Sequence, residues 1–295
     1  MFMNKGESIG KILEKRKKLF SVEFFPPKDD AGGKRMLKTA ERFQPYDPDF
    51  VSITYGAGGG TRETTMRYAK LLQDENGFEV MPHLTCVGHT RDELLRILED
   101  FATAGFCNVM ALRGDPPKGE TCFRPIEGGF SYASDLVSLI RENFPQFGIG
   151  VGGYPEKHPE ALDQTTDLKN LKTKVEAGAD FITTQLFFDN QAFFRFVSEC
   201  KKNGISVPIL PGLLPVLSLS QVKRFCSMCE ARLPSELEHG LQQCEESEQP
   251  EIGADWALDQ VKELLHEGCP GFHLYALNKS ESTLKILEGL GRKQS

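Results

Sequence analysis

The chain has 295 residues, 39% of them hydrophobic and 26% charged, an ordinary composition for a soluble globular protein with a sizeable core. Its formal net charge is −7 and it lacks a dense Lys/Arg patch, which argues against nucleic acid because phosphate neutralisation requires clustered cations. The N-terminus lacks the apolar core of a signal peptide and no apolar run could span a membrane, so we expect a cytoplasmic protein without a membrane partner.

The predicted elements begin with a helix over residues 5–18, in which Ile12 and Leu13 share an apolar face and the cations form a solvated face. Strand-like runs then recur along the chain, and most are almost continuously apolar, as expected for parallel strands covered on both faces. The eight runs are 19–25, 49–55, 79–85, 107–113, 148–154, 180–188, 207–214 and 271–277.

Amphipathic helical patterns lie between these runs. Residues 91–104 are one example, with Thr90 as the expected N-cap and Gly105 just beyond the C-terminal end. Eight strand and helix units in this length predict one α/β domain, a (β/α)8 TIM barrel over residues 1–295 with an extra N-terminal helix. A doubly wound sheet is the alternative, but the glycine fingerprint that normally follows an early strand of such a sheet is missing. The acidic stretch 245–251 predicts a solvated loop.

Glu23 stands in the stretch FSVEFFPP, inside a run that otherwise predicts a buried strand. A carboxylate is costly to bury unless it is paired or protonated, so this position is a candidate for function. We expect burial to raise the pKa of Glu23, so that the carboxyl stays protonated near neutral pH and acts as a general acid.

Polar residues gather at the ends of the predicted strands, where the loops of a barrel converge and active sites are built. Taken alone, His83 fits a core imidazole bonded to a backbone carbonyl better than a ligand contact, and the Gly114–Pro117 stretch would fit a simple turn. Cys226 and Cys229 have metal-ligand spacing, but no second Cys or His pair lies nearby, so no metal site is predicted. No Ser/His/Asp or Cys/His arrangement has suggestive spacing. The strand-end residues are Glu23, Thr54, Tyr55, His83, Arg113, Gly114, Asp115, Tyr154, His158, Gln185, Gln221, Asn278 and Lys279.

Longer motifs make a family resemblance visible. The chain is similar to methylenetetrahydrofolate reductases from about Phe20 to about Lys279 through VEFFPP, ITYGAGG, PHLTC, ALRGDPP, YASDLV, GGYPEKHPEA, DLKNLKTKVEAGAD, TTQLFFD, LPGLLPV and FHLYALNK. The resemblance implies a TIM barrel that binds FAD, reduces it with NAD(P)H and passes the hydride to 5,10-methylenetetrahydrofolate. The product, 5-methyltetrahydrofolate, feeds methionine synthesis. Both substrates would use the same flavin face in turn, which implies ping-pong kinetics.

The resemblance also implies roles for individual residues. Glu23 would be the general acid, protonating the nitrogen that leaves when the folate's five-membered ring opens. Asp115 would lie near the flavin N1 and C2 carbonyl edge and contact the pterin. The implied FAD contacts are Thr54, Tyr55, Ala57, His83, Arg113, Gly114, Asp115, Tyr132, Ala133, Tyr154, His158, Asp167, Asn170 and Lys174, of which Arg113 and Lys174 suit the pyrophosphate. The implied folate contacts are Gln185, Gln221, Phe225 and Lys279, the last standing where the family has Arg.

Other readings remain open from the sequence. A pterin-binding TIM-barrel methyltransferase without redox chemistry is one rival, and a non-catalytic ligand-binding barrel is another. The motifs do not distinguish NADH from NADPH. Family members commonly form homo-oligomers, and eukaryotic ones continue into a regulatory domain that binds S-adenosylmethionine. This sequence stops after LGRKQS, so we expect no such domain in it.

Overall fold

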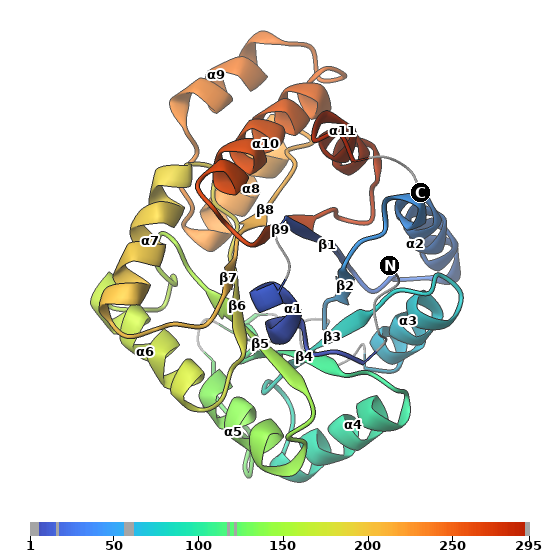
Figure 1. The fold of residues 1–295 in the computed structure, drawn as a ribbon, viewed down its shortest axis with the longest axis vertical. Coiled ribbons are helices and arrows are strands. Elements are labelled where there is room, and N and C mark those ends of the chain that lie inside the picture. The colour runs from blue at the N-terminus through green and yellow to red at the C-terminus, as the bar shows by residue number, and fades with distance from the viewer. Residues whose placement is uncertain (1–5, 16–17, 56–61, 117–118, 121–122, 293–295) are drawn as a thin grey trace.

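The computed structural model describes residues 6–15, 18–55, 62–116, 119–120 and 123–292. Within them, nine parallel strands form a nearly closed barrel surrounded by helices, as Figure 1 shows. The strands are β1 (Leu19–Phe24), β2 (Phe50–Ile53), β3 (Val80–Thr85), β4 (Asn108–Leu112), β5 (Gly148–Gly153), β6 (Phe181–Thr184), β7 (Ile209–Leu210), β8 (Gly212–Leu213) and β9 (Gly271–Tyr275). The predicted TIM-barrel fold is confirmed.

The predicted strand 207–214 is wrong in one respect, because it is split at Pro211. β7 pairs with β6 and β8 pairs with β9, so the two short strands together close the barrel. Proline has no N–H for the ladder, and the Pro211 carbonyl instead accepts from the His273 N–H at 2.8 Å. The Gly212 N–H bonds the Thr184 hydroxyl at 3.0 Å.

An outer ring of helices follows the strands in chain order (Figure 1). The N-cap of α4 is a capping box between Thr90 and Glu93, and Gly105 has a φ of 84°, so the predicted ends of this helix are confirmed. The ring comprises α2 (Asp30–Phe43), α3 (Arg62–Asp74), α4 (Arg91–Thr103), α5 (Ala133–Asn143), α6 (Gln164–Glu176), α7 (Asn190–Lys202), α8 (Leu219–Cys229), α10 (Gln249–His266) and α11 (Glu281–Gly289).

Two further helices and a turn complete the described chain, α1 (Ile9–Lys15), α9 (Ser235–Gln243) and the short 3-10 helix η1 (Gln44–Tyr46). The predicted solvated loop 245–251 is wrong in its last three residues, because α10 begins at Gln249. The Gln249 side chain is buried, accepting from the Leu219 N–H at 2.8 Å and donating to the Leu241 carbonyl at 3.0 Å. Among the described helices, none is both long and apolar enough to cross a membrane.

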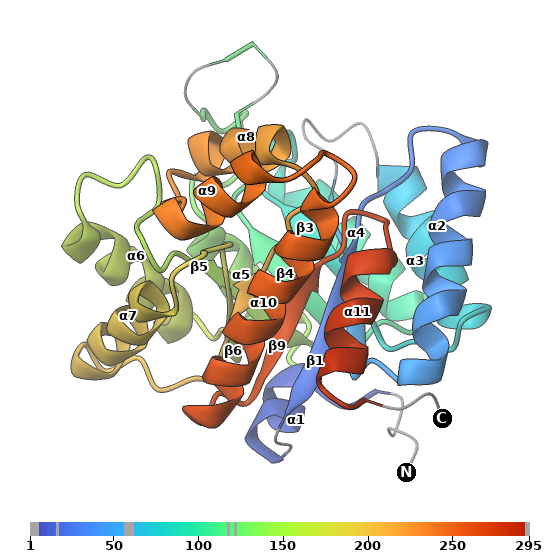
Figure 2. The same cartoon turned by 90° about the horizontal axis from the view of Figure 1, so that it is seen from above.

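Helix α1 closes the amino-terminal end of the barrel. Ile9, Ile12 and Leu13 pack against the lower interior side chains, which are Leu19, Phe50, Met81, Met110, Phe181 and Leu210. The Ile9 N–H donates to the Asn108 side chain at 2.8 Å, which fixes the helix to β4. In Figure 2, α1 lies at one end of the barrel and α8 at the other. The interior is therefore covered by α1 at its amino-terminal end.

Candidate active site

The interior of the barrel changes from apolar to polar towards its carboxyl end. Side chains alternate between the two faces of a strand. In β1, Val22 and Phe24 belong to the core under the helices, whereas Leu19 belongs to the interior cluster above α1. Ser21 and Glu23 therefore also face the interior. The carboxyl end of the barrel interior is called the mouth below. By the same alternation on β2, β3, β6 and β9, the side chains that face it are Ser52, His83, Thr85, Thr183, His273 and Tyr275.

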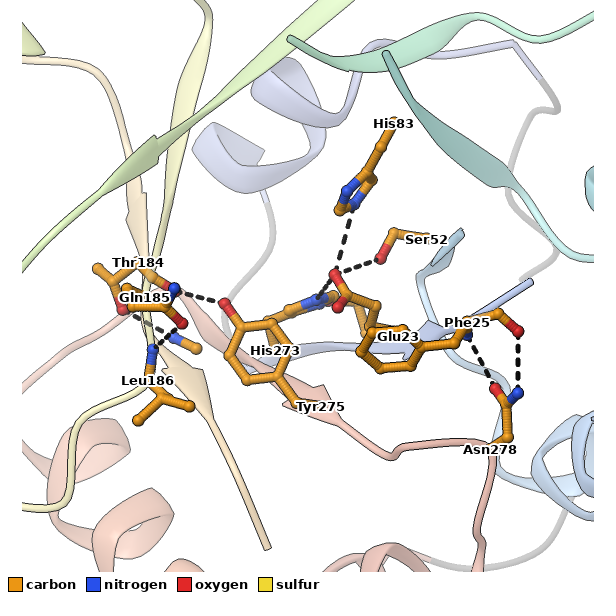
Figure 3. Close-up of polar contacts among 12 residues, drawn as sticks. Glu23, Phe25, Ser52, His83, Thr184, Gln185, Leu186, His273, Tyr275 and Asn278 are labelled. Carbon is orange, nitrogen blue, oxygen red and sulfur yellow. Dashed lines mark hydrogen bonds and ion pairs between the residues drawn. The ribbon is translucent and has the colours of Figure 1, made fainter. Parts of the chain in front are cut away.

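Glu23 is the centre of this polar layer, and it is only 6% exposed. Its Oε2 atom accepts from the Ser52 hydroxyl at 3.3 Å and lies 3.5 Å from His273 Nε2 and 3.4 Å from His83 Nε2. Figure 3 shows these groups converging on the carboxyl group. When His273 Nε2 donates to Glu23, its Nδ1 is left to accept from the Ser21 hydroxyl, 2.7 Å away.

The predicted rise in the pKa of Glu23 is wrong. Burial does raise it, but the hydrogen bond from His273 and the charges of His83 and His273 lower it by more, so the pKa of Glu23 lies below its ordinary value. Burial lowers the pKa of His83. Glu23 is therefore one member of a cluster with two imidazoles, not an isolated carboxyl in an apolar strand.

Three buried side-chain atoms near the mouth have no hydrogen-bond partner in the described part of the chain. They are His83 Nε2, which lies near Glu23 without hydrogen-bond geometry, Thr85 Oγ1 and Thr183 Oγ1. Buried polar atoms are nearly always paired, so these three fit a ligand with hydrogen-bonding edges. On β5, a Cβ added to Gly152 would meet only Leu112, at 3.6 Å, so this strand leaves space for such a ligand. These features fit a planar group such as the flavin ring.

The loop after β5 and helix α6 bring four of the predicted cofactor contacts together. The Tyr154 and His158 rings lie 4.6 Å apart, and the His158 N–H donates to Asp167 Oδ2 at 3.0 Å. Lys174 reaches from α6 to the Gly152 carbonyl at 2.5 Å. Burial lowers the pKa of Lys174 to about 8. This cation therefore lies at the carboxyl end of β5, beside the Gly152 carbonyl.

The Arg113 side chain forms an ion pair with Glu160. Its guanidinium forms two hydrogen bonds with the Glu160 carboxylate, at 2.6 and 2.7 Å, so Glu160 would compete with a bound pyrophosphate for this cation. Gly114 has a φ of 90°, and a Cβ there would lie 2.7 Å from Val87, so the position requires glycine. Asp115 is exposed, and its charge acts on Arg113 and Tyr154, which places it on the same side of the mouth.

The remaining predicted cofactor contacts are more scattered. The buried Tyr55 side chain is committed to His89, with its hydroxyl 3.0 Å from Nε2, so a ligand contact there would use the main chain. Thr54 is half-buried at the end of β2, and Ala57 lies outside the described residues. At the outer rim, Tyr132 and Asn170 are exposed and Ala133 is half-buried at the start of α5.

The predicted folate contacts come from three elements at the mouth. Gln185 follows β6 and its side chain accepts from the Leu186 N–H at 2.9 Å, while Gln221 accepts from the Leu217 N–H at 3.2 Å. Phe225 is partly buried on α8. Lys279 is exposed after β9, next to Asn278, whose amide pairs with both main-chain polar groups of Phe25 at 2.9 and 2.8 Å (Figure 3).

The sequence reasoning missed Ser21, Ser52, His273 and Tyr275. Their strands look like continuous apolar runs. Side chains two positions apart share one face of a strand, so Ser21 lies on the same face as Glu23, and His273 and Tyr275 share a face within 271–277. The Tyr275 hydroxyl donates to the Thr184 carbonyl at 2.5 Å, which links β9 to β6 across the mouth (Figure 3).

Comparisons with known proteins identify the family of the chain. The family model for methylenetetrahydrofolate reductase matches residues 8–291. The chain is 42% identical to 5,10-methylenetetrahydrofolate reductase of Escherichia coli (strain K12), covering 92% of this chain and 90% of that protein. It is 38% identical to methylenetetrahydrofolate reductase (NADH) 1 of Arabidopsis thaliana over 97% of this chain. It spans about half the length of that plant relative, 50%.

Among solved structures, the chain resembles an uncharacterised Clostridium thermocellum protein described as binding two copies of 5-methyl-5,6,7,8-tetrahydrofolic acid. The TM-score is 0.64 at 18% identity, and the match covers 96% of this chain and 98% of that one. At this identity the likeness concerns the fold alone.

Proposed function

Because this chain belongs to the methylenetetrahydrofolate reductase family, we propose that it reduces 5,10-methylenetetrahydrofolate to 5-methyltetrahydrofolate, with FAD as cofactor and NAD(P)H as electron donor. The observation that supports this best is Glu23, buried at the carboxyl end of the barrel within 3.5 Å of both His83 and His273. A reduction that begins with protonation of a leaving nitrogen needs such a proton donor, held in place and away from bulk water.

The residues that would hold FAD lie around β5 and the neighbouring strand ends. His83, Thr85 and Thr183 would meet the polar edges of the ring, Gly152 would leave room for its face, and Lys174 would face the pyrophosphate. When bound, FAD would supply the hydride chemistry, taking a hydride from NAD(P)H and giving it to the folate in ping-pong order.

We infer that Glu23 is the acid and that His83 and His273 set its pKa. Glu23 Oε2 and His83 Nε2 lie 3.4 Å apart, so the protonation of each depends on the charge of the other. Ser52 and His273 hold the carboxyl group from two different strands, β2 and β9. This fixes Oε2 in position, which is what general-acid catalysis requires of the donor.

The folate would occupy the side of the mouth bordered by α8 and the β9–α11 loop. Gln185 and Gln221 would hydrogen-bond the pterin edges, and Phe225 would stack on a ring of the substrate. Lys279 would meet a carboxylate of the folate tail as a single charge, without the paired donors of an Arg.

The experiment that tests this function is an anaerobic assay of the purified protein with FAD, 5,10-methylenetetrahydrofolate and either NADH or NADPH. We expect 5-methyltetrahydrofolate, identified by mass spectrometry, in an amount equal to the nicotinamide oxidised, and no product when FAD or the nicotinamide is omitted. A protein that makes no product, yet transfers a methyl group from 5-methyltetrahydrofolate to an added acceptor, would instead be a pterin-dependent methyltransferase.

A further inference from the structure

Lys157 has an unusual backbone conformation in the loop between β5 and α6. Its φ is 118°, a backbone conformation that residues other than glycine rarely adopt. Such a conformation persists only where the surrounding contacts determine it, and it is often found where a loop serves a ligand site. The loop also carries Tyr154 and His158, two of the proposed FAD contacts.

The side chain of Lys157 accounts for this conformation. Its Nζ donates to three main-chain carbonyls of its own loop, those of His158 at 2.9 Å, Pro159 at 3.2 Å and Ala161 at 3.0 Å. An ammonium group has three N–H donors, and all three are used here. Three carbonyl oxygens of the loop therefore surround the Lys157 ammonium group, as carbonyl oxygens surround a bound metal ion.

The same cation reaches a second element. The Glu230 carboxylate lies 3.4 Å from Lys157 Nζ, and Glu230 is the C-cap of α8, with a φ of 52°. Beside this ion pair, Glu156 accepts from the Arg232 N–H at 3.0 Å. Two adjacent loop residues thus hold the segment just after α8, the helix that carries Gln221 and Phe225.

We propose that Lys157 is a positioning residue that shapes the FAD-side loop and, through Glu230, fixes the C-terminal end of α8 on the folate side. The assignment of the two sides rests on the proposed function, whereas the link between the loop and α8 does not. With its three donors taken by carbonyls, Lys157 acts through the loop and α8 and does not bind ligand itself.

The first test replaces Lys157 with Met, which keeps the length of the side chain and removes the charge. Lys172→Met is the matched control, because Lys172 forms an ordinary helix-surface ion pair with Glu176 at 3.8 Å. We expect faster amide hydrogen exchange at residues 158–163 and 230–232 in Lys157→Met only. We also expect the folate KM to rise roughly fivefold or more, with a much smaller change in kcat.

The second test uses Lys157→Gly, which suits the positive φ and leaves a space for a free amine. Adding n-butylammonium should restore slow exchange and the folate KM, whereas n-butanol, which has no charge, should not. Glu230→Gln keeps the three hydrogen bonds from Lys157 to the loop carbonyls and removes only the ion pair, so faster exchange should be confined to residues 230–232. If neither Lys157 variant folds, the exchange rates of Glu230→Gln alone test the link between the loop and α8.

Hydrogen exchange separates this inference from the proposed function, since it needs no activity. If the protein does not reduce folate but the exchange pattern changes as described, the link stands and the proposed function fails. If exchange and the folate KM in Lys157→Met and Glu230→Gln match those of Lys172→Met, Lys157 is not a positioning residue.

Discussion

Glu23 Oε2 lies 3.4 Å from His83 Nε2, in a pair whose side chains are only 8% and 9% exposed. The two residues come from β1 and β3, with β2 between them, and Ser52 of β2 holds the same carboxylate oxygen. An acid and a base that are this close and this buried influence each other's protonation strongly. The geometry therefore ties the protonation of Glu23 to its neighbours, and the first two predictions below concern that cluster.

Replacing Glu23 with Gln should abolish folate reduction selectively. Gln keeps the size and polarity but cannot donate a catalytic proton, so the folate half-reaction should slow by roughly 10²- to 10⁴-fold. FAD binding and the reduction of FAD by NAD(P)H should change little. Stopped-flow spectroscopy of each half-reaction checks this, with Glu41→Gln on the exposed side of α2 as the control. Normal folate turnover in Glu23→Gln would remove Glu23 from the mechanism.

Replacing His273 with Phe, which has no hydrogen-bond donor, should move the pH profile of folate reduction. Burial by itself raises the pKa of Glu23, and the hydrogen bond from His273 is the largest influence that lowers it. Without that hydrogen bond the pKa rises, so the limb of the kcat/KM profile that reports Glu23 should shift to higher pH. A lower rate with an unshifted profile would mean that His273 serves only the packing of the barrel.

The affinity for FAD should fall as the pH rises through about 8, because Lys174 has a pKa lowered to about 8 by burial and loses its charge in this range. FAD carries an anionic pyrophosphate, so the protonated form of Lys174 binds it better, and binding in turn raises the pKa of Lys174. Lys174→Met should bind FAD about tenfold more weakly at pH 7, equal to about 1.4 kcal/mol, and lose this pH dependence. Fluorescence titration measures both effects, and Lys169→Met, exposed on α6, is the control. An identical pH dependence in Lys174→Met and the unmodified protein would contradict this role.

Replacing Asp115 with Asn should raise the midpoint potential of the bound flavin. A negative charge near the flavin disfavours its anionic reduced form, so removing the charge makes reduction easier. Because Asp115 is exposed, water screens its charge, and we expect a shift of roughly 30 mV, about 1.4 kcal/mol for a two-electron couple. Spectroscopic titration against a reference dye gives this potential. A potential equal to that of the unmodified protein would leave Asp115 with pterin recognition alone.

Much of the fold could be predicted from the sequence because its signals are local. Apolar runs mark the strands, and Thr90 and Gly105 mark the two ends of α4. The break at Pro211 could also have been anticipated, since proline cannot donate to a ladder. Its consequence, closure of the barrel by two short strands, depends on pairing with β6 and β9, which no local pattern specifies.

The chemical state of the site could not be predicted in the same way, because it depends on partners far away in the sequence. His273 lies 250 residues from Glu23, and it helps to reverse the effect of burial on the pKa of Glu23. Glu160, 47 residues from Arg113, occupies the guanidinium expected to bind pyrophosphate. Strand ends thus predict which residues gather at the mouth, whereas their protonation and availability follow from contacts that only the folded chain defines.

The most direct test of the proposed activity is the visible absorption spectrum of the FAD-loaded protein, recorded without oxygen. NADH or NADPH is added first and 5,10-methylenetetrahydrofolate second. We predict that the flavin absorption bleaches with the nicotinamide and returns with the folate, and that Glu23→Gln bleaches normally but does not recover. A protein that binds no FAD, or whose bleached flavin is not reoxidised by the folate, would contradict the account.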